Sequence, residues 1–292
     1  SGSSAEELVP LASLIRKTEE QGDLYDTVSY GNQTVSYPRP FLFSVQPQTE
    51  HPNGDRRSTL SRTVCLYDNA GESFQPGKDS AAAPVTRHMA HSSVLFFVFD
   101  PTQDSRFQRK MTEAGCGLET ATRTMRQEPI LQEAAARIRR YAGLRQSDKH
   151  NRPLVVILTK FDSWWQLHSN DAAPNPWREV RQPNAEDEAN AIISALDVSQ
   201  IETQSQLARD MLLRITPEIV TAAEGFAREV IFIPVSSVGW NIEVDRRTGQ
   251  QAIRPIEAQP YWVTAPFLYG LSRAASGLIP SVTKRQVDLQ NG

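Results

Sequence analysis

Apolar residues gather in five short runs, and these runs carry the clearest secondary-structure signal in the chain. They are rich in β-branched and aromatic residues and are bounded by polar or glycine-containing segments, which is typical of β-strands. The run VLFFVFD is apolar without alternation, which indicates a strand covered on both faces, as in parallel sheets. The turn-rich segment HPNGDRRS predicts a hairpin between the first two strands. The predicted strands are residues 41–46, 62–67, 94–100, 153–159 and 229–235.

Helical patterns lie between these strands. Residues 128–145 place apolar side chains on one stripe, and Gly143 predicts the end of that helix. Residues 163–183 are polar, aromatic and rich in proline and predict an inserted loop, and residues 240–262 predict a polar excursion. Strands that alternate with helices predict an α/β fold with a mostly parallel, doubly wound sheet and one antiparallel hairpin. The other predicted helices are residues 82–91, 185–196, 203–226 with a kink at Pro217, and 265–277.

The first residues predict a peripheral region. Residues 5–17 predict a short helical piece broken at Pro10, and residues 18–40 predict an irregular arm with one hairpin. Residues 1–4 resemble the remnant of an expression tag, so we expect the natural chain to begin further upstream. The predicted division is residues 1–36 as tag remnant and arm, and 37–292 as a GTPase-like domain with insertions at about 163–200 and 240–262.

Composition narrows the class of protein. The chain has 292 residues, of which 39% are hydrophobic and 22% charged, as in ordinary globular proteins. A net charge of -3 does not favour nucleic acid as a partner. Cys65 and Cys116 are too few for a disulfide framework, which predicts reduced thiols and a cytoplasmic location. No apolar stretch approaches the roughly 18 residues that a membrane span needs, so no span is expected.

Polar residues directly follow three of the predicted strands. In a parallel sheet the carboxyl ends of the strands meet at one edge, where ligands bind. Each segment also has an ordinary explanation: Asp68 and Gly71 suit a turn, Asp162 or Ser163 can cap a helix, and the third segment can be a plain turn. The segments are VCLYDNAGE at 64–72, LVVILTKFD at 154–162 and IFIPVSSVG at 231–239.

In this order and at these spacings the segments resemble the DxxG, [NT]KxD and SA-type motifs of TRAFAC-type P-loop GTPases. The resemblance covers most of residues 37–277, and it is strongest to the prokaryotic double-GTPase proteins, which accompany conflict or defence modules. It implies a sheet of P-loop GTPase type and a switch domain that binds GTP or GDP with Mg2+, with a protein partner or adjacent domain. The subfamily resemblance lies in YPRPFLFSVQP at 37–47, DNAGESF at 68–74 and APFLYGLS at 265–272.

The resemblance implies that two loops read the guanine base. The Asp162 carboxylate would accept hydrogen bonds from guanine N1 and N2, which adenine cannot donate, and this argues against an ATP-using relative. The stem of Lys160 would pack over the base, and Thr159 stands where many relatives carry Asn. In the third segment, a backbone N–H at about Ser237, next to Ser236, would meet guanine O6.

The resemblance also implies a phosphate and metal side. Asp68 would hold the water shell of Mg2+, and Gly71 would let a backbone N–H approach the γ-phosphate. Glu72 stands where many relatives place the Gln or His that orients the attacking water. A carboxylate there adds negative charge near the phosphates, so we expect slow, partner-stimulated hydrolysis. Thr34 fits the spacing of the switch threonine, with Thr18 as its rival.

The phosphate loop itself is missing. GxxxxGK[ST] occurs nowhere in the sequence, and the central strand that precedes it is missing too, which would leave a gap in the sheet and unpaired strand edges. Three explanations compete: the loop lies upstream in the natural protein, another chain supplies it, or the protein is a degenerate relative. The expected function is a GTP-hydrolysing switch in its complete form, and the alternative is a pseudo-GTPase interaction module that binds no nucleotide.

Other patterns have simpler interpretations. His88 and His91 lie three residues apart, but no third ligand is near, so a metal site is not favoured. Trp164 and Trp165 are expected to pack beneath the inserted loop. FDPTQD at 99–104 resembles the segment between the family's motifs, but Pro101 and Asp104 suit a turn that closes a buried strand. The run of Arg137, Arg139 and Arg140 predicts a solvated helix face.

Overall fold

The computed structural model describes most of the chain. The described residues are 8–10, 25–30, 33–38, 40–69, 74, 86–116, 125–168, 173, 175–181 and 192–283. In these ranges the protein is a mixed α/β structure, as the sequence predicts, and one of its sheets is entirely parallel. The strands divide among five sheets in the described ranges, so the single large sheet expected from the sequence is not formed by them.

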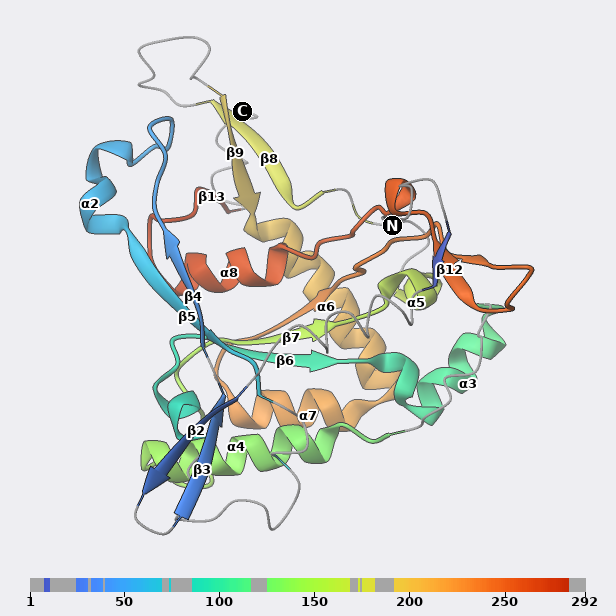
Figure 1. The fold of residues 1–292 in the computed structure, drawn as a ribbon, viewed down its shortest axis with the longest axis horizontal. Helices are drawn as coiled ribbons and strands as arrows, with labels where there is room; N and C mark the ends of the chain where they lie inside the picture. The colour runs from blue at the N-terminus through green and yellow to red at the C-terminus, as the bar shows by residue number, and fades with distance from the viewer. Residues whose placement is uncertain are drawn as a thin grey trace.

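The parallel sheet has the strand order β10-β7-β6 and forms the centre of the core (Figure 1). β6 spans Leu95–Phe99, β7 spans Leu154–Leu158 and β10 spans Val230–Pro234. Four of the five residues of β7 are buried, because a strand with a neighbour on each edge and helices over its faces needs apolar side chains on both sides. The prediction that residues 153–159 and 229–235 form strands is confirmed.

Helices cover both faces of this sheet. Figure 1 shows α8 (Ala265–Ala274) on one side of β6 and β7 and the α4–α7 pair on the other. α4 (Glu128–Ala142) ends at Gly143, which has φ 68°, so the predicted stop is confirmed. The predicted kink at Pro217 is a complete break, which separates α6 (Val198–Ile215) from α7 (Pro217–Phe226).

The predicted antiparallel hairpin is also present, but it forms a sheet of its own. β4 (Pro40–Val45) pairs with β5 (Arg62–Tyr67) along their whole length. The connection is longer than a tight turn and contains η1 (Gly54–Arg56) and α2 (Arg57–Leu60). A second hairpin, β2 (Tyr25–Tyr30) with β3 (Gln33–Pro38), confirms the hairpin predicted in the N-terminal arm.

Three predictions about local structure are wrong. The segment 163–183 is not a loop throughout, because it contains most of α5 (Phe161–His168) and the strand β8 (Trp177–Arg181). The helix predicted at 185–196 is contradicted by β9 (Ile192–Asp197), which pairs with β8 and with β13 (Ser281–Val282). Within 5–17, β1 (Val9–Pro10) pairs with β12 instead of forming a helix. β1 and β9 pair with β12 and β13, which are far away in the chain, and a local pattern does not reveal such pairing.

The remaining elements are short. The predicted helix at 82–91 is reduced, in its described part, to the 3-10 helix η3 (Arg87–His91). The predicted polar excursion at 240–262 holds a small hairpin that pairs with β1. The other elements are η4 (Pro101–Gln103), α3 (Ser105–Glu113), β11 (Glu243–Val244), β12 (Gln251–Ile253) and η6 (Pro255–Glu257).

Arg137 corrects the prediction of a solvated arginine face. Its side chain is 2% exposed, although it lies in an exposed-looking run of α4. It donates to Glu133 at 2.8 Å and lies over the ring of Phe74 at 5.4 Å, so a paired charge replaces an apolar residue in the core. Arg139 stacks over Phe226. Among the helices that the structure describes, none is long and apolar enough to cross a membrane.

Candidate functional site

The loops that follow β6, β7 and β10 are joined by backbone hydrogen bonds at the carboxyl end of the parallel strands. The Thr159 N–H donates to the Phe99 carbonyl at 3.0 Å, which ties the loop after β7 to β6. The Phe161 N–H donates to the Val235 carbonyl at 3.0 Å, which ties the same loop to β10. The two segments predicted to read the base therefore lie side by side, with the loop after β7 in the middle.

Lys160, in the middle loop at this end of the sheet, has a left-handed backbone conformation. Its φ is 55°, in the left-handed region that costs an L-residue about 1–2 kcal/mol. The turn is held by the Phe161 N–H bond to β10 and by the Ser163 N–H, which donates to the Lys160 carbonyl at 2.9 Å. A strained non-glycine residue held by its surroundings is common at functional sites.

The Lys160 ammonium is already engaged. Its Nζ lies 2.8 Å from Asp100 Oδ2 and 3.4 Å from the Thr102 hydroxyl. Asp100 is nearly buried, and its other oxygen accepts from the Thr102 N–H at 3.0 Å and the Thr102 hydroxyl at 2.6 Å. Asp100 thus fixes both the turn after β6 and the position of Lys160. Sequence reasoning missed this ion pair, and its only local signal was a strand that ends in Asp.

Asp162 stands in the first turn of α5, next to this lysine. Its carboxylate is partly exposed, and one oxygen accepts from the Ser163 hydroxyl at 3.2 Å. Below it, Trp164 is fully buried, and its indole N–H donates to the Thr159 carbonyl at 2.8 Å. Trp164 packs edge-on against Phe161, so the loop rests on the core. The prediction that Trp164 packs is confirmed, although it lies on a helix.

In the loop after β10, the two predicted serines differ in their exposure to solvent. Ser236 is buried, exchanges two backbone hydrogen bonds with Tyr261, and accepts the Gly239 N–H on its hydroxyl at 2.8 Å. Ser237 is exposed on the outside of the same turn. Gly239 has φ 79°, and a Cβ there would lie 2.3 Å from the Gln259 carbonyl oxygen, so only glycine fits. Ser236 therefore stabilises the loop, whereas the exposed Ser237 is accessible to solvent.

The structure describes only some of the residues predicted for the phosphate side. Asp68 is exposed just after β5, and neighbouring Asn69 has an amide nitrogen 3.3 Å from His88 Nε2. Gly71 and Glu72 lie outside the described residues, as does the rival Thr18. Thr34 is in β3, where its backbone pairs with Ser29. Of these residues, Asp68 and Thr34 are therefore carried by two different sheets, neither of which is the parallel sheet.

A large cavity separates β5 from β6. Its volume is about 1250 Å3, and it extends along the whole of β5 and most of β6, between α4 and α8. Most of its lining side chains are apolar, with Leu131 and Ile138 from α4 and Phe267 and Leu271 from α8. We call this cavity the β5–β6 groove. Asp68 lies at one end of it.

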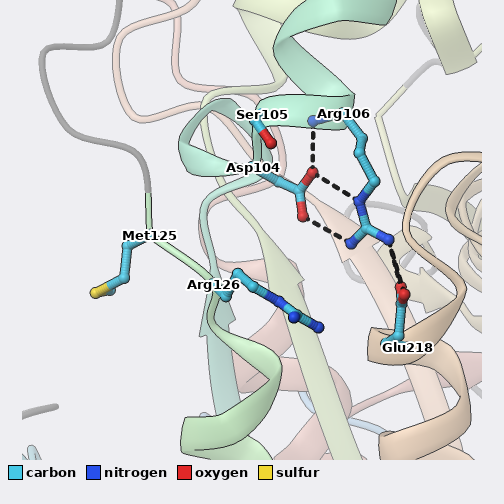
Figure 2. Close-up of a pocket in the computed structure, with 6 residues that line it drawn as sticks. All are labelled: Asp104, Ser105, Arg106, Met125, Arg126 and Glu218. Carbon is cyan, nitrogen blue, oxygen red and sulfur yellow. Dashed lines mark hydrogen bonds and ion pairs between the residues drawn. The ribbon is translucent and has the colours of Figure 1, made fainter.

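A second, smaller pocket of about 220 Å3 is charged (Figure 2). Figure 2 shows Arg106 between Asp104 and Glu218. Its guanidinium nitrogens lie 3.0 Å from Asp104 Oδ2 and 2.8 Å from Glu218 Oε1. Burial raises the pKa of Asp104, but hydrogen bonds from the Arg106 side chain and backbone outweigh it and lower the pKa overall. Hydrogen bonding to Arg106 also lowers the pKa of Glu218. Arg106 pairs with both carboxylates and links α3 to α7, and Arg126 adds a second positive charge to the lining, so this pocket is a structural ion cluster. The turn predicted at Asp104 is confirmed, since Asp104 caps α3.

Comparisons with known proteins do not identify the chain. No model of a protein family matches it, and neither a curated protein nor a solved structure was found to be similar. Among the described residues, no group of three or more His, Cys, Asp or Glu side chains could hold a metal ion. Cys65 and Cys116 are both free thiols.

Proposed function

We propose that this chain is a guanine-nucleotide-binding switch domain related to the P-loop GTPases. In its complete form it would bind GTP and GDP with Mg2+ and hydrolyse GTP slowly. The observation that carries the proposal is the contact between the loops after β7 and β10, where the Phe161 N–H donates to the Val235 carbonyl. That contact places Thr159-Lys160-Phe161-Asp162 beside Ser236-Ser237, as reading one base from two sides requires.

The base side of the proposed site has the right chemistry for guanine. Asp162 offers a partly exposed carboxylate, which accepts from the adjacent N1–H and N2–H of guanine and from no equivalent pair on adenine. Ser237 is exposed in the adjacent loop, and its backbone N–H would donate to guanine O6. Lys160 is anchored through its ammonium to Asp100, which directs its aliphatic stem across the carboxyl edge.

The phosphate side does not fit a nucleotide with the described residues alone. Asp68 is one exposed carboxylate, whereas Mg2+ takes six ligands and is normally shared between protein and phosphates. Nothing like the phosphate-cradling loop occurs in the sequence. We therefore assign recognition of the base to this chain and derive no step of hydrolysis from it.

The second candidate is a pseudo-GTPase interaction module that binds no nucleotide. The missing GxxxxGK[ST] motif favours it, because charge-assisted contacts to phosphate are a large part of nucleotide affinity. The open β5–β6 groove also favours it, because a large apolar cavity is suited to a polypeptide partner.

Substituting Asp162 by Asn tests the proposal. Xanthine carries a carbonyl where guanine has its 2-amino group, so the amide of the variant can donate where the carboxylate accepts. Each charged hydrogen bond is worth about 1.5–3 kcal/mol. We expect Asp162→Asn to weaken GDP binding at least about tenfold and to favour xanthosine diphosphate, as followed by NMR titration.

Asp55→Asn is the matched control, because Asp55 is an exposed carboxylate in η1, outside the three loops. It should bind GDP as the unchanged chain does. Equal GDP binding by the unchanged chain and by Asp162→Asn would refute the role of Asp162. Absence of any guanine preference in the unchanged chain would favour the interaction module.

A further inference from the structure

β6 has a free edge. The Leu95 N–H donates to the Pro153 carbonyl, and the Phe99 carbonyl accepts from Thr159, so these alternate residues direct their backbone toward β7. Because the backbone groups of neighbouring residues in a strand point to opposite edges, those of Phe96 and Val98 point away from β7. Within the described part of the chain, no strand pairs with that edge.

At the end of this edge, a side chain forms the hydrogen bonds that a neighbouring strand would form. Asp100 is the next residue whose backbone points away from β7, and the buried Gln127 side chain satisfies it completely. The Asp100 N–H donates to Gln127 Oε1 at 3.1 Å, and Gln127 Nε2 donates to the Asp100 carbonyl at 2.8 Å. An amide side chain thus takes the place of a neighbouring strand at this one position. No such side chain serves Phe96 and Val98 among the described residues.

β5 has the opposite free edge, across the groove. It pairs with β4 on one side, and in the described ranges no strand pairs with it on the other. All of its residues, Arg62–Tyr67, line the β5–β6 groove together with Phe96 and Val98. Two strand edges therefore border the same cavity from different sheets.

Apolar side chains from α4 and α8 line the groove on both sides of the space between β5 and β6. α4 supplies Leu131 and Ile138, and α8 supplies Phe267 and Leu271. Val98 is 60% exposed there, which is unusual for valine in a central sheet. A volume of about 1250 Å3 also exceeds the roughly 300–1,000 Å3 of small-molecule sites.

We propose that an extended strand of a partner polypeptide fills the β5–β6 groove and pairs with β5 and β6 at once. Only an extended chain carries alternating donors and acceptors on two edges, since a helix uses its own groups internally. The strand would be about five residues long, as β6 is, and apolar on both faces because α4 and α8 cover them. It would join β4-β5 and β6-β7-β10 into one sheet. This inference stands without the proposed guanine site.

The probe is a synthetic peptide with the sequence Lys-Lys-Val-Ile-Val-Val-Ile-Lys-Lys, blocked at both ends. Its control has the same side chains but N-methyl groups on alternate residues, which remove the donors along one edge. Amide hydrogen exchange of the full chain is measured residue by residue. Without peptide, the Phe96 and Val98 amides should exchange much faster than that of Phe97, which faces β7. The first peptide should slow both at least about tenfold, and the N-methylated peptide should not.

Two variants locate the site. Val98→Lys places a charge in the groove at an already exposed position, and it should weaken the peptide at least about tenfold. Ile256→Lys makes the same change at a residue that is 67% exposed and lies outside the groove, and it should bind as the unchanged chain does. Circular dichroism checks that both variants fold.

Three results would overturn the proposal. Slow exchange of Phe96 and Val98 in the chain alone would mean that the edge is already paired. Equal binding of the N-methylated peptide would exclude backbone pairing. A dimer in sedimentation that Val98→Lys converts to a monomer would assign the groove to a second copy. Loss of guanine preference with intact peptide protection would refute only the proposed function.

Discussion

Replacing Lys160 by glycine and by alanine measures the strain in the loop after β7. Both variants lose the ion pair with Asp100, which is worth about 0–1 kcal/mol because the lysine side chain is 55% exposed. Alanine keeps the left-handed penalty of about 1–2 kcal/mol at φ 55°, whereas glycine does not. Glycine instead loses about 0.5–1 kcal/mol through its greater freedom in the unfolded chain. Lys160→Gly should therefore be more stable than Lys160→Ala by about 0.5–1 kcal/mol.

Lys110 supplies the control for this comparison. It lies in α3, is also partly exposed, and also pairs with a carboxylate, Glu113, at 2.6 Å. Its helical backbone reverses the sign, so Lys110→Gly should be less stable than Lys110→Ala by about 1 kcal/mol. Guanidinium unfolding of the four variants gives both differences. If glycine were no better than alanine at position 160, the left-handed turn that shapes the proposed base loop would be wrong.

Two further predictions concern groups beneath the same loop. Trp164→Phe removes the hydrogen bond from the indole to the Thr159 carbonyl and leaves a smaller ring, so it should cost about 2 kcal/mol in denaturant unfolding; a cost under about 0.5 kcal/mol would contradict the packing described here. Burial lowers the pKa of His168 below its ordinary 6.5, although a hydrogen bond with Gln204 opposes this. Its contribution to stability is therefore present above pH 6.5 and is lost as the pH falls below it. His168→Gln should flatten the fall in unfolding free energy between about pH 7 and 5, and an unchanged slope would show that His168 is not buried in its neutral form.

Local patterns were enough for the elements that carry their own signal. β6, β7 and β10 are continuous apolar runs, and each lies within one residue of its predicted bounds. α4 combines one apolar stripe with a glycine stop, and it begins at the predicted residue and ends three residues before the predicted bound. The sequence predicts a helix where β9 lies, because the pairing of β9 has no local signal. Its partner β13 is far away in the chain, and its partner β8 lies in a segment predicted as a loop. Pairing between distant strands outweighs local propensity there.

The site was predictable only in part, for the same reason. The order of the segments predicted that the loops after β7 and β10 meet, because parallel strands end at one edge. The Asp100–Lys160 pair, the backbone of Lys160 and the burial of Arg137 depend on contacts between separate elements. A pattern along the sequence does not show which distant residues are in contact.

The most direct test of guanine recognition is an NMR titration of the unchanged chain with GDP and with ADP, both with Mg2+. Without a phosphate loop we expect affinity near the millimolar range, about -4 kcal/mol, which NMR detects. GDP should shift the amide signals of Phe161, Ser237 and Gly239, and ADP at the same concentration should leave them in place. Equal shifts with both nucleotides, or none with either, would contradict the assignment of a guanine-reading edge to this fold.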